Sequence, residues 1–275
     1  MTIRHLLLAS ATVAALGSTS LLARPWQNKA DGFRDTPLLP GGKWHVHDSE
    51  RPQPPVVTPG TASTPEAPGK APSDAVVLFN GSDTSAWAAN NGSACPWKVE
   101  DGSLVVAART GPINTKQAFG DCQIHLEYAT PKPTKGRGQG RGNSGLLIMG
   151  RYEVQILDCF ENPTYADGTV GAVYGQTPPL ANASRPPGEW QSLDVVFTAP
   201  RFKADGSVET PAYVTAFVNG VLTQNHTASL GPVVYRAVAH YEKHADREPI
   251  QLQDHGAPMR FRNIWVREVK SVEAP

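Results

Sequence analysis

The residues most suggestive of chemistry lie on a predicted hairpin of two strands, 145–149 and 152–157, and in the second strand polar and apolar side chains alternate. Successive side chains of a strand point to opposite faces. Glu153, Gln155 and Leu157 therefore point one way, and the intervening apolar residues point the other way. One face of the second strand is then core, while the opposite face offers a carboxylate beside an amide.

Two further segments carry polar side chains at the same spacing. A predicted strand over 122–128 places His125 and Glu127 on one face, and the segment 251–256 places Gln253 and His255 on one face if it is extended. A solvated outer face of a sheet would show the same alternation. Glu, Gln, Asn and His are, however, the side chains that hydrogen-bond sugar hydroxyls, so we predict one shared, concave groove that binds a carbohydrate.

Composition narrows the class of protein. The 275 residues hold 25 Lys plus Arg and 25 Asp plus Glu, so no net charge attracts nucleic acid or an anionic membrane. The 25 Gly and 25 Pro indicate many turns and little helix. The chain is long enough for one large sandwich domain.

The N-terminal part reads as an export signal followed by a linker. A basic start, an apolar run over 6–17 and small residues before Arg24 predict a signal peptide at 1–23. The apolar run is too short to span a bilayer. We therefore expect an exported protein, periplasmic or secreted. Residues 24–73 form an extended segment with seven prolines between Glu50 and Asp74, which predicts a linker or a strap laid across the domain.

The remaining residues, 74–270, read as short strands separated by turns. Glu100-Asp101-Gly102, Gly150-Arg151 and Asn219-Gly220 are turn sequences. No segment has a helical period, so we predict two antiparallel sheets stacked as a β-sandwich. The predicted strands are 75–79, 97–100, 103–106, 122–128, 145–149, 152–157, 191–198, 213–218, 221–226, 250–253 and 259–268.

Two long loops and the cysteines complete the pattern. The loop 130–142 reads as a solvated segment or as a lip over the groove, and the segment 200–211 reads as a hairpin tip. Cys95, Cys122 and Cys159 are too few and too far apart for a zinc framework. Buried apolar roles are favoured for them, and a bridge between Cys95 and Cys122 stays open.

Several motifs along 75–269 resemble the 3-keto-disaccharide hydrolase family, formerly a domain of unknown function with a concanavalin A-like jelly-roll fold. The motifs occur in the family's order and cover nearly the whole predicted domain. They are Leu78-Phe79-Asn80-Gly81 with Trp87, Trp97 to Gly102, Asn143-Ser144-Gly145 to Asp158, Gly171 to Gly175, Gly188-Glu189-Trp190, Asn219-Gly220, Gln251 to Gly256 and Arg262-Asn263-Ile264-Trp265.

The resemblance implies cleavage of a glycoside, or disaccharide, that a separate sugar 3-dehydrogenase has already oxidised at C3. A ketone at C3 acidifies the hydrogen on C2, so a base removes it, the C1 substituent leaves by elimination, and water then adds. Carried onto this sequence, the resemblance places proton transfer on two residues and substrate binding on five. The catalytic pair is Glu153 and His255, and the substrate-binding set is Glu127, Asn143, Gln155, Gln253 and Glu189.

Alternatives stay open at this point. A lectin-like, non-catalytic β-sandwich would keep the same polar face. A conventional endo-glucanase would need a second carboxylate about 5 Å from the first, where this strand has Gln155. No cofactor is required by the pattern, although a divalent cation held by Glu127, Glu153 and His255 is conceivable. Asp254-His255-Gly256 could equally be a structural turn.

Overall fold

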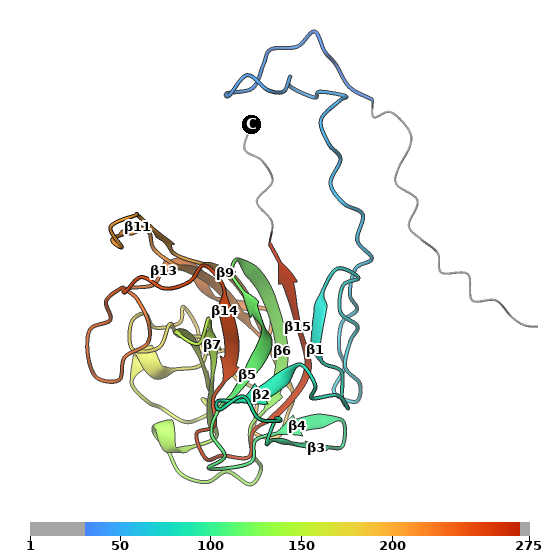
Figure 1. Ribbon diagram of the computed structural model, residues 1–275. Coiled ribbons are helices and arrows are strands. Elements are labelled where there is room, and N and C mark those ends of the chain that lie inside the picture. Colours follow the sequence, from blue (N-terminus) through green and yellow to red (C-terminus); the bar gives the residue numbers. More distant parts are fainter. Residues whose placement is uncertain (1–30, 270–275) are drawn as a thin grey trace, which may run out of the picture. The chain divides into compact units, whose positions relative to one another are not determined.

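The computed structural model describes residues 31–269, and in this part of the chain it is an all-β protein without α-helix (Figure 1). Two short 3-10 turns, η1 (Gly138–Gly140) and η2 (Ala166–Gly168), interrupt the loops. The strands are β1 (Val76–Phe79), β2 (Trp87–Ala89), β3 (Lys98–Glu100), β4 (Ser103–Val105), β5 (Ile113–Phe119), β6 (Cys122–Ala129), β7 (Asn143–Ile148), β8 (Tyr152–Leu157), β9 (Gln191–Thr198), β10 (Arg201–Phe202), β11 (Val208–Thr210), β12 (Tyr213–Val218), β13 (Val221–Ala228), β14 (Glu248–Leu252) and β15 (Arg260–Glu268).

The strands form two antiparallel sheets stacked as a sandwich, as the sequence predicts. The larger sheet has eight strands in the order β13-β12-β9-β6-β15-β4-β3, with β1 also paired to β15. The smaller sheet has five strands in the order β2-β5-β14-β7-β8. β10 and β11 form a separate hairpin over the predicted 200–211 tip.

The space between the sheets is filled by apolar side chains from both. Leu126, Phe197 and Phe261 from the larger sheet and Val154 and Ile156 from the smaller sheet are almost fully buried. These are the residues that the period of two assigns to the core. Burial of such side chains stabilises a sandwich, and it leaves the opposite faces of β7 and β8 free to carry polar groups.

Most predicted strands coincide with observed ones, and 152–157, 191–198 and 213–218 match to the residue. The turn after β7 lies one residue earlier than predicted, because Met149 and Gly150 take up the left-handed conformation. β5 was missed. Its polar side chains, among them Lys116 and Gln117, hide the strand pattern.

The described residues before the sandwich, 31–54, form a compact unit of their own with isolated bridges between Phe33 and Asp48 and between Leu38 and His45. The predicted signal peptide, 1–23, lies outside the described residues. Within 31–269, no helix is long and apolar enough to cross a membrane.

The Pro-rich segment from Pro55 onward belongs to the same compact unit as the sandwich, so it is a strap rather than a free linker. It runs out and back as an irregular hairpin. The Thr61 N–H donates to the Lys70 carbonyl at 3.0 Å, and the Ser73 N–H donates to the Thr58 carbonyl at 3.0 Å. The strap lies along the outer face of the larger sheet, where it covers part of a pocket of about 930 Å³.

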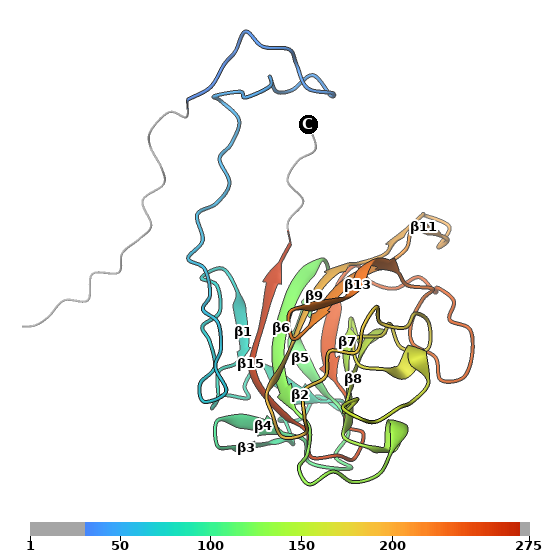
Figure 2. The same ribbon diagram turned by 180° about the vertical axis from the view of Figure 1, so that it is seen from behind.

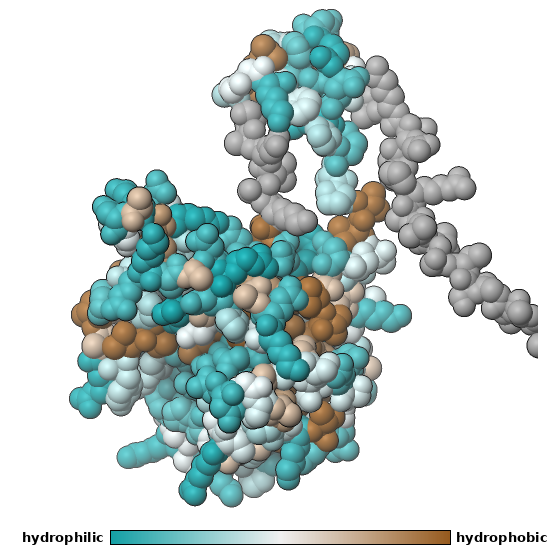
Figure 3. All heavy atoms as spheres, viewed as in Figure 1, coloured by the Kyte–Doolittle hydropathy of each residue, from teal (hydrophilic) through white to brown (hydrophobic). Residues whose placement is uncertain are grey.

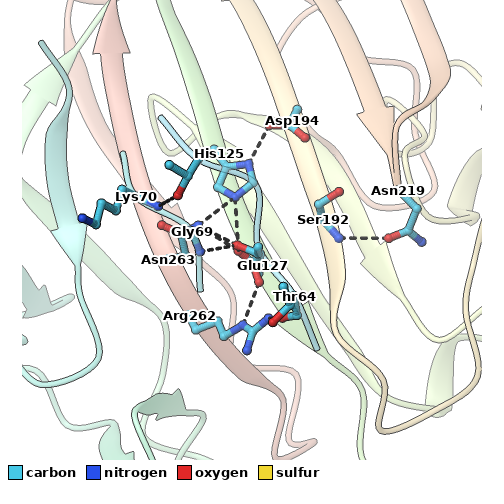
Figure 4. Close-up of polar contacts among 12 residues, drawn as sticks. Thr64, Gly69, Lys70, His125, Glu127, Ser192, Asp194, Asn219, Arg262 and Asn263 are labelled. Carbon is cyan, nitrogen blue, oxygen red and sulfur yellow. Dashed lines mark hydrogen bonds and ion pairs between the residues drawn. The ribbon is translucent and has the colours of Figure 1, made fainter. Parts of the chain in front are cut away.

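A buried carboxylate on the larger sheet anchors the strap (Figure 4). Glu127 on β6 accepts from Arg262 Nε at 2.7 Å and from Asn263 Nδ2 at 2.8 Å, both on β15. It also accepts from the Ser63 hydroxyl of the strap. Arg262 reaches the strap as well, because its Nη2 donates to the Thr64 carbonyl at 2.6 Å. The carboxylate and the guanidinium are both almost fully buried, so this ion pair joins the strap to the sheet.

His125 extends the same network. Its Nδ1 lies 2.6 Å from Asp194 Oδ1, its Nε2 lies 3.5 Å from Glu127 Oε1, and its ring stacks on Trp265. Burial lowers the pKa of His125, but the hydrogen bonds to Asp194 and Glu127 outweigh burial and raise the pKa to about 9. Burial raises the pKa of Glu127, but hydrogen bonds from His125, Ser63, Asn263 and Arg262 outweigh it and lower the pKa to about 2.

Replacement of the anchor should release the strap. Glu127→Gln leaves the Arg262 guanidinium buried without its counter-charge, which should lower the free energy of unfolding by about 3 kcal/mol. The contribution of Glu127 is present above its ordinary pKa of 4.5 and is lost as the pH falls toward 2. The contribution of charged His125 is present below 6.5 and is lost as the pH rises through 9. The difference from wild type should therefore be largest between pH 4.5 and 6.5 in urea unfolding.

Trypsin cleavage after Lys70, an exposed strap residue, reports release of the strap from the larger sheet. This cleavage should be faster in Glu127→Gln than in wild type. Glu189→Gln, at an exposed position of the same pocket, is the matched control and should resemble wild type. Equal unfolding and cleavage in wild type and Glu127→Gln would contradict the anchoring role.

Candidate active site

A pocket of about 600 Å³ lies beside β7 and β8, on the side of these strands that faces away from the core. Loops between β8 and β9 lie over the same two strands, as Figure 2 shows. Five of the seven residues predicted from the sequence line this pocket: Asn143, Glu153, Gln155, Gln253 and His255. The other lining residues are Gln139, Gly140, Leu147, Tyr165, Tyr174, Val233 and Tyr235.

Glu153 is the most unusual group in the pocket. Its side chain is 6% exposed, and it has no hydrogen bond or ion pair with any other residue of 31–269. Burial raises the pKa of its carboxyl from 4.5 to about 7, since nothing nearby compensates for the loss of water around the charged form. Such a carboxyl exchanges a proton near neutral pH, which is the property of a general acid or base.

The β7–β8 hairpin holds Glu153 in place. β7 and β8 pair from Asn143 to Ile148, and the loop after β8 covers the other edge of β8, where the Tyr174 N–H donates to the Glu153 carbonyl at 3.1 Å. Glu153 pairs with Leu147 across the two strands, and its side chain extends diagonally over Gly145. A Cβ at that position would lie 2.3 Å from Glu153 Oε1, so glycine is needed here for close approach.

Three amide side chains form the floor of the pocket. Gln139 Oε1 accepts from Gln155 Nε2 at 3.0 Å and from Asn143 Nδ2 at 3.3 Å, while Gln139 Nε2 donates to the Gly168 carbonyl at 2.9 Å. Gln155 is thereby fixed, and its Oε1 accepts from the Ile156 N–H. The Asn143 Oδ1 is buried without a hydrogen-bond partner in the described part of the chain, so it is an unsatisfied acceptor beneath the pocket.

His255 lies at the exposed edge of the pocket, and Asp254 shapes the turn that presents it. Asp254 Oδ1 accepts from the Gly256 N–H at 2.8 Å, and its Oδ2 accepts from the Gly111 N–H at 3.1 Å. The segment is therefore a structural turn, and this turn also brings His255 to the pocket. Gln253 is tied to β7 through its backbone, and its carboxamide makes no hydrogen bond within 31–269.

Tyrosines form the remaining wall. The hydroxyls of Tyr165 and Tyr174 lie 2.6 Å apart, and their rings meet edge to face. Tyr235 is 72% exposed and comes from the loop between β13 and β14. Tyr165, Tyr235 and Gln139 were not singled out in the sequence, because loop residues carry no period, and Tyr174 entered only as part of the motif Gly171 to Gly175. For Gln139 the one available signal was the interpretation of 130–142 as a lip over the groove, which its position supports.

Two of the predicted substrate-binding residues lie elsewhere. Glu127 and Glu189 line the pocket beneath the strap on the larger sheet, whereas Glu153 belongs to the smaller sheet. The expectation of one shared groove is therefore wrong for these two residues. The period of two fixes the face of each strand, but it does not tell which sheet the strand joins, and Glu127 instead pairs with Arg262.

The same separation overturns the conceivable cation site of Glu127, Glu153 and His255, because Glu127 lies in a different pocket from the other two. Across residues 31–269, no three His, Cys, Asp or Glu side chains come together as a metal-binding group. The bridge between Cys95 and Cys122 is also wrong, since all three cysteines are free thiols. Cys122 and Cys159 are buried, as predicted.

Comparison with known proteins agrees with this geometry. Residues 74–267 match the model of the 3-keto-α-glucoside-1,2-lyase-like domain. A candidate glycosyl hydrolase of Parabacteroides distasonis, solved at 2.13 Å, is 46% identical, with a TM-score of 0.77 over 85% of this chain and 100% of that chain. The similarity to this structure covers more of the chain than the family model does. No curated protein matches the chain.

A second structure from the same organism, at 1.70 Å, is 24% identical over 72% of this chain and 94% of the other, with a TM-score of 0.52. At this distance the likeness supports the fold alone. The family match and the 46% identical relative are sufficient for assignment. The chain belongs to the family of 3-keto-α-glucoside-1,2-lyase-like domains.

Proposed function

We propose that the protein hydrolyses the glycosidic bond of 3-keto-glycosides by elimination followed by hydration. The C3 ketone acidifies the hydrogen on C2, and a base removes it as a proton. The electron pair of the C2–H bond then forms the C1=C2 double bond, while the C1–O bond breaks and the leaving oxygen takes up a proton. Water adds across this double bond, with hydroxyl at C1 and hydrogen at C2, so the net reaction is hydrolysis.

Glu153 is the base in this proposal, and its environment is the observation that carries it. The carboxyl is buried and unpartnered in the described structure, and burial raises its pKa to about 7. A base with a pKa near the working pH is both available and strong enough to attack an acidified carbon acid. The rigid hairpin behind it limits the orientations that the carboxylate takes up.

The neighbouring side chains have complementary roles. His255 lies at the open edge of the pocket, where a leaving group departs, so it protonates the leaving oxygen. The Gln253 carboxamide is free to donate to the developing enolate oxygen. The amide floor of Gln139, Asn143 and Gln155 positions the sugar hydroxyls.

The pocket argues against a conventional glucanase. Retaining enzymes need two carboxyl groups about 5 Å apart, and inverting enzymes also need two. Among the described lining residues Glu153 is the single carboxylic acid. Elimination next to a ketone requires only one such base, so the arrangement fits that chemistry better.

Two wider expectations belong to this proposal. The substrate must first be oxidised at C3, so the protein acts after a separate sugar 3-dehydrogenase. The apolar N-terminal run after the basic residues supports export to the periplasm or the medium. The source of the C3 ketone and the export of the protein both concern events outside the pocket, whereas the ketone itself is required by the chemistry at Glu153.

The purified protein should release the leaving group from a 3-keto-glucoside and not from the unoxidised glucoside. Glu153→Gln should lower that rate at least about 100-fold, since general-base catalysis typically supplies this factor. Glu189→Gln lies outside the pocket and should retain wild-type activity. Saturable binding of the sugar without release of the leaving group would favour the lectin-like alternative instead. Parallel reactions with a chelator test whether the activity needs a divalent cation.

The pH dependence should follow the carboxyl. Only ionised Glu153 accepts a proton, so on the acid side of the profile kcat/KM should rise with pH through an apparent pKa of about 7. In Glu153→Gln this rise of kcat/KM near pH 7 should be absent. If wild-type kcat/KM instead rose with pH around 4.5, the group acting as base would not be desolvated as described.

Gly145→Ala tests the close approach of the two strands. The added methyl would occupy the space of Glu153 Oε1 and displace the carboxylate, so kcat should fall by about 100-fold. Unfolding curves show whether the fold is retained. Wild-type kcat in a folded Gly145→Ala protein would mean that the position of the carboxylate is not critical.

A further inference from the structure

A second pocket of about 460 Å³ adjoins the candidate active site. The two pockets share three lining residues, Tyr165, Tyr174 and Tyr235, so the tyrosine wall of one is also a wall of the other. Its other lining residues are Asp167, Gly175, Val234, Arg236, Ala237 and Val238. The two pockets are therefore direct neighbours that meet at these tyrosines.

The second pocket is lined largely by aromatic and aliphatic side chains that face solvent. Tyr235 is 72% exposed, Val238 is 81% exposed and Val234 is 37% exposed. In Figure 3 hydrophobic residues form a patch at the side of the molecule where Figure 1 shows the loop between β13 and β14. Apolar side chains gathered beside a pocket, rather than scattered singly, mark a binding surface.

The base of this loop is fixed to the site. The Val233 N–H donates to the Arg151 carbonyl at 2.7 Å, directly before Tyr152 on β8. Gln176 Nε2 donates to the Gly231 carbonyl at 3.0 Å, close to the shared tyrosine Tyr174. The position of Tyr235 is thus tied to the strand that carries Glu153. The hydrogen bonds therefore hold the walls of the two pockets in a fixed arrangement.

We propose that this second pocket holds the leaving group of the substrate, and that this group is apolar or aromatic rather than a second sugar. The inference rests on the proposed function, in which the C1 substituent departs from the sugar bound at Glu153. An aromatic leaving group stacks on tyrosine rings and packs on valines. A sugar would need several free hydrogen-bonding side chains, whereas the hydroxyls of Tyr165 and Tyr174 bond each other. The charged side chains in the described lining are Asp167 and Arg236.

The test compares three substrates: the benzyl and methyl 3-keto-α-glucosides and a 3-keto-disaccharide. Benzyl alcohol and methanol have similar acidity, so a rate difference between the first two substrates reports contacts of the leaving group and not its chemistry. Wild type should show a kcat/KM about tenfold higher for the benzyl than for the methyl compound, and a lower value for the disaccharide.

Val238→Ser should reduce the ratio of benzyl to methyl kcat/KM to about one, and Val234→Ser should lower it in the same direction. Val221→Ser, at an exposed valine on β13 outside this pocket, is the matched control and should keep both the ratio and the rates. A benzyl to methyl ratio near one in wild type, or a disaccharide cleaved faster than the benzyl compound, would overturn the inference while leaving the proposed function intact.

Two other outcomes are distinguishable. Cleavage of none of the three keto compounds would overturn the proposed function and the inference with it. Sedimentation of wild type as a dimer that Val238→Ser dissociates would assign the exposed patch to a second copy of the chain, which also overturns the inference.

Discussion

The candidate site depends on one costly feature, the burial of the Glu153 carboxyl without a partner. A buried charge without compensation is unfavourable, so the protein keeps this group only where the surrounding structure forces it to stay. The β7–β8 pairing and the loop that covers the free edge of β8 fix the backbone of Glu153, and the glycine at position 145 leaves room for its carboxyl. The raised pKa of Glu153 is the direct consequence.

The molecule contains a useful internal comparison in Glu127. Both glutamates are almost fully buried on strands of the same sandwich. Glu127 accepts hydrogen bonds from Arg262, Asn263 and Ser63, and its pKa falls to about 2, so it stays ionised and joins the strap to the sheet. Glu153 lacks such partners among the described residues, and its pKa rises to about 7. The same side chain is thus structural in one place and suited to proton transfer in the other.

Periodicity predicted the parts of this structure that depend on local geometry. The faces of β8 follow from alternation alone, and the turn at Asn219 follows from its tolerance of positive φ. The polar strand β5 gave no such signal. The sheet to which a strand belongs is decided by long-range pairing, and for this reason Glu127 was placed in the wrong groove. Gln139 and Tyr235 reach the site from loops, whose paths the sequence pattern does not encode.

The most direct test of this account is the titration of Glu153 itself. Carbon-13 NMR of protein labelled at glutamate side-chain carboxyls, with Glu153→Gln to assign the signal, measures its pKa without substrate. The account predicts a value of about 7, well above the ordinary 4.5. A value near 4.5 would contradict it, because the carboxyl would then be hydrated or paired and would have no special role as a base.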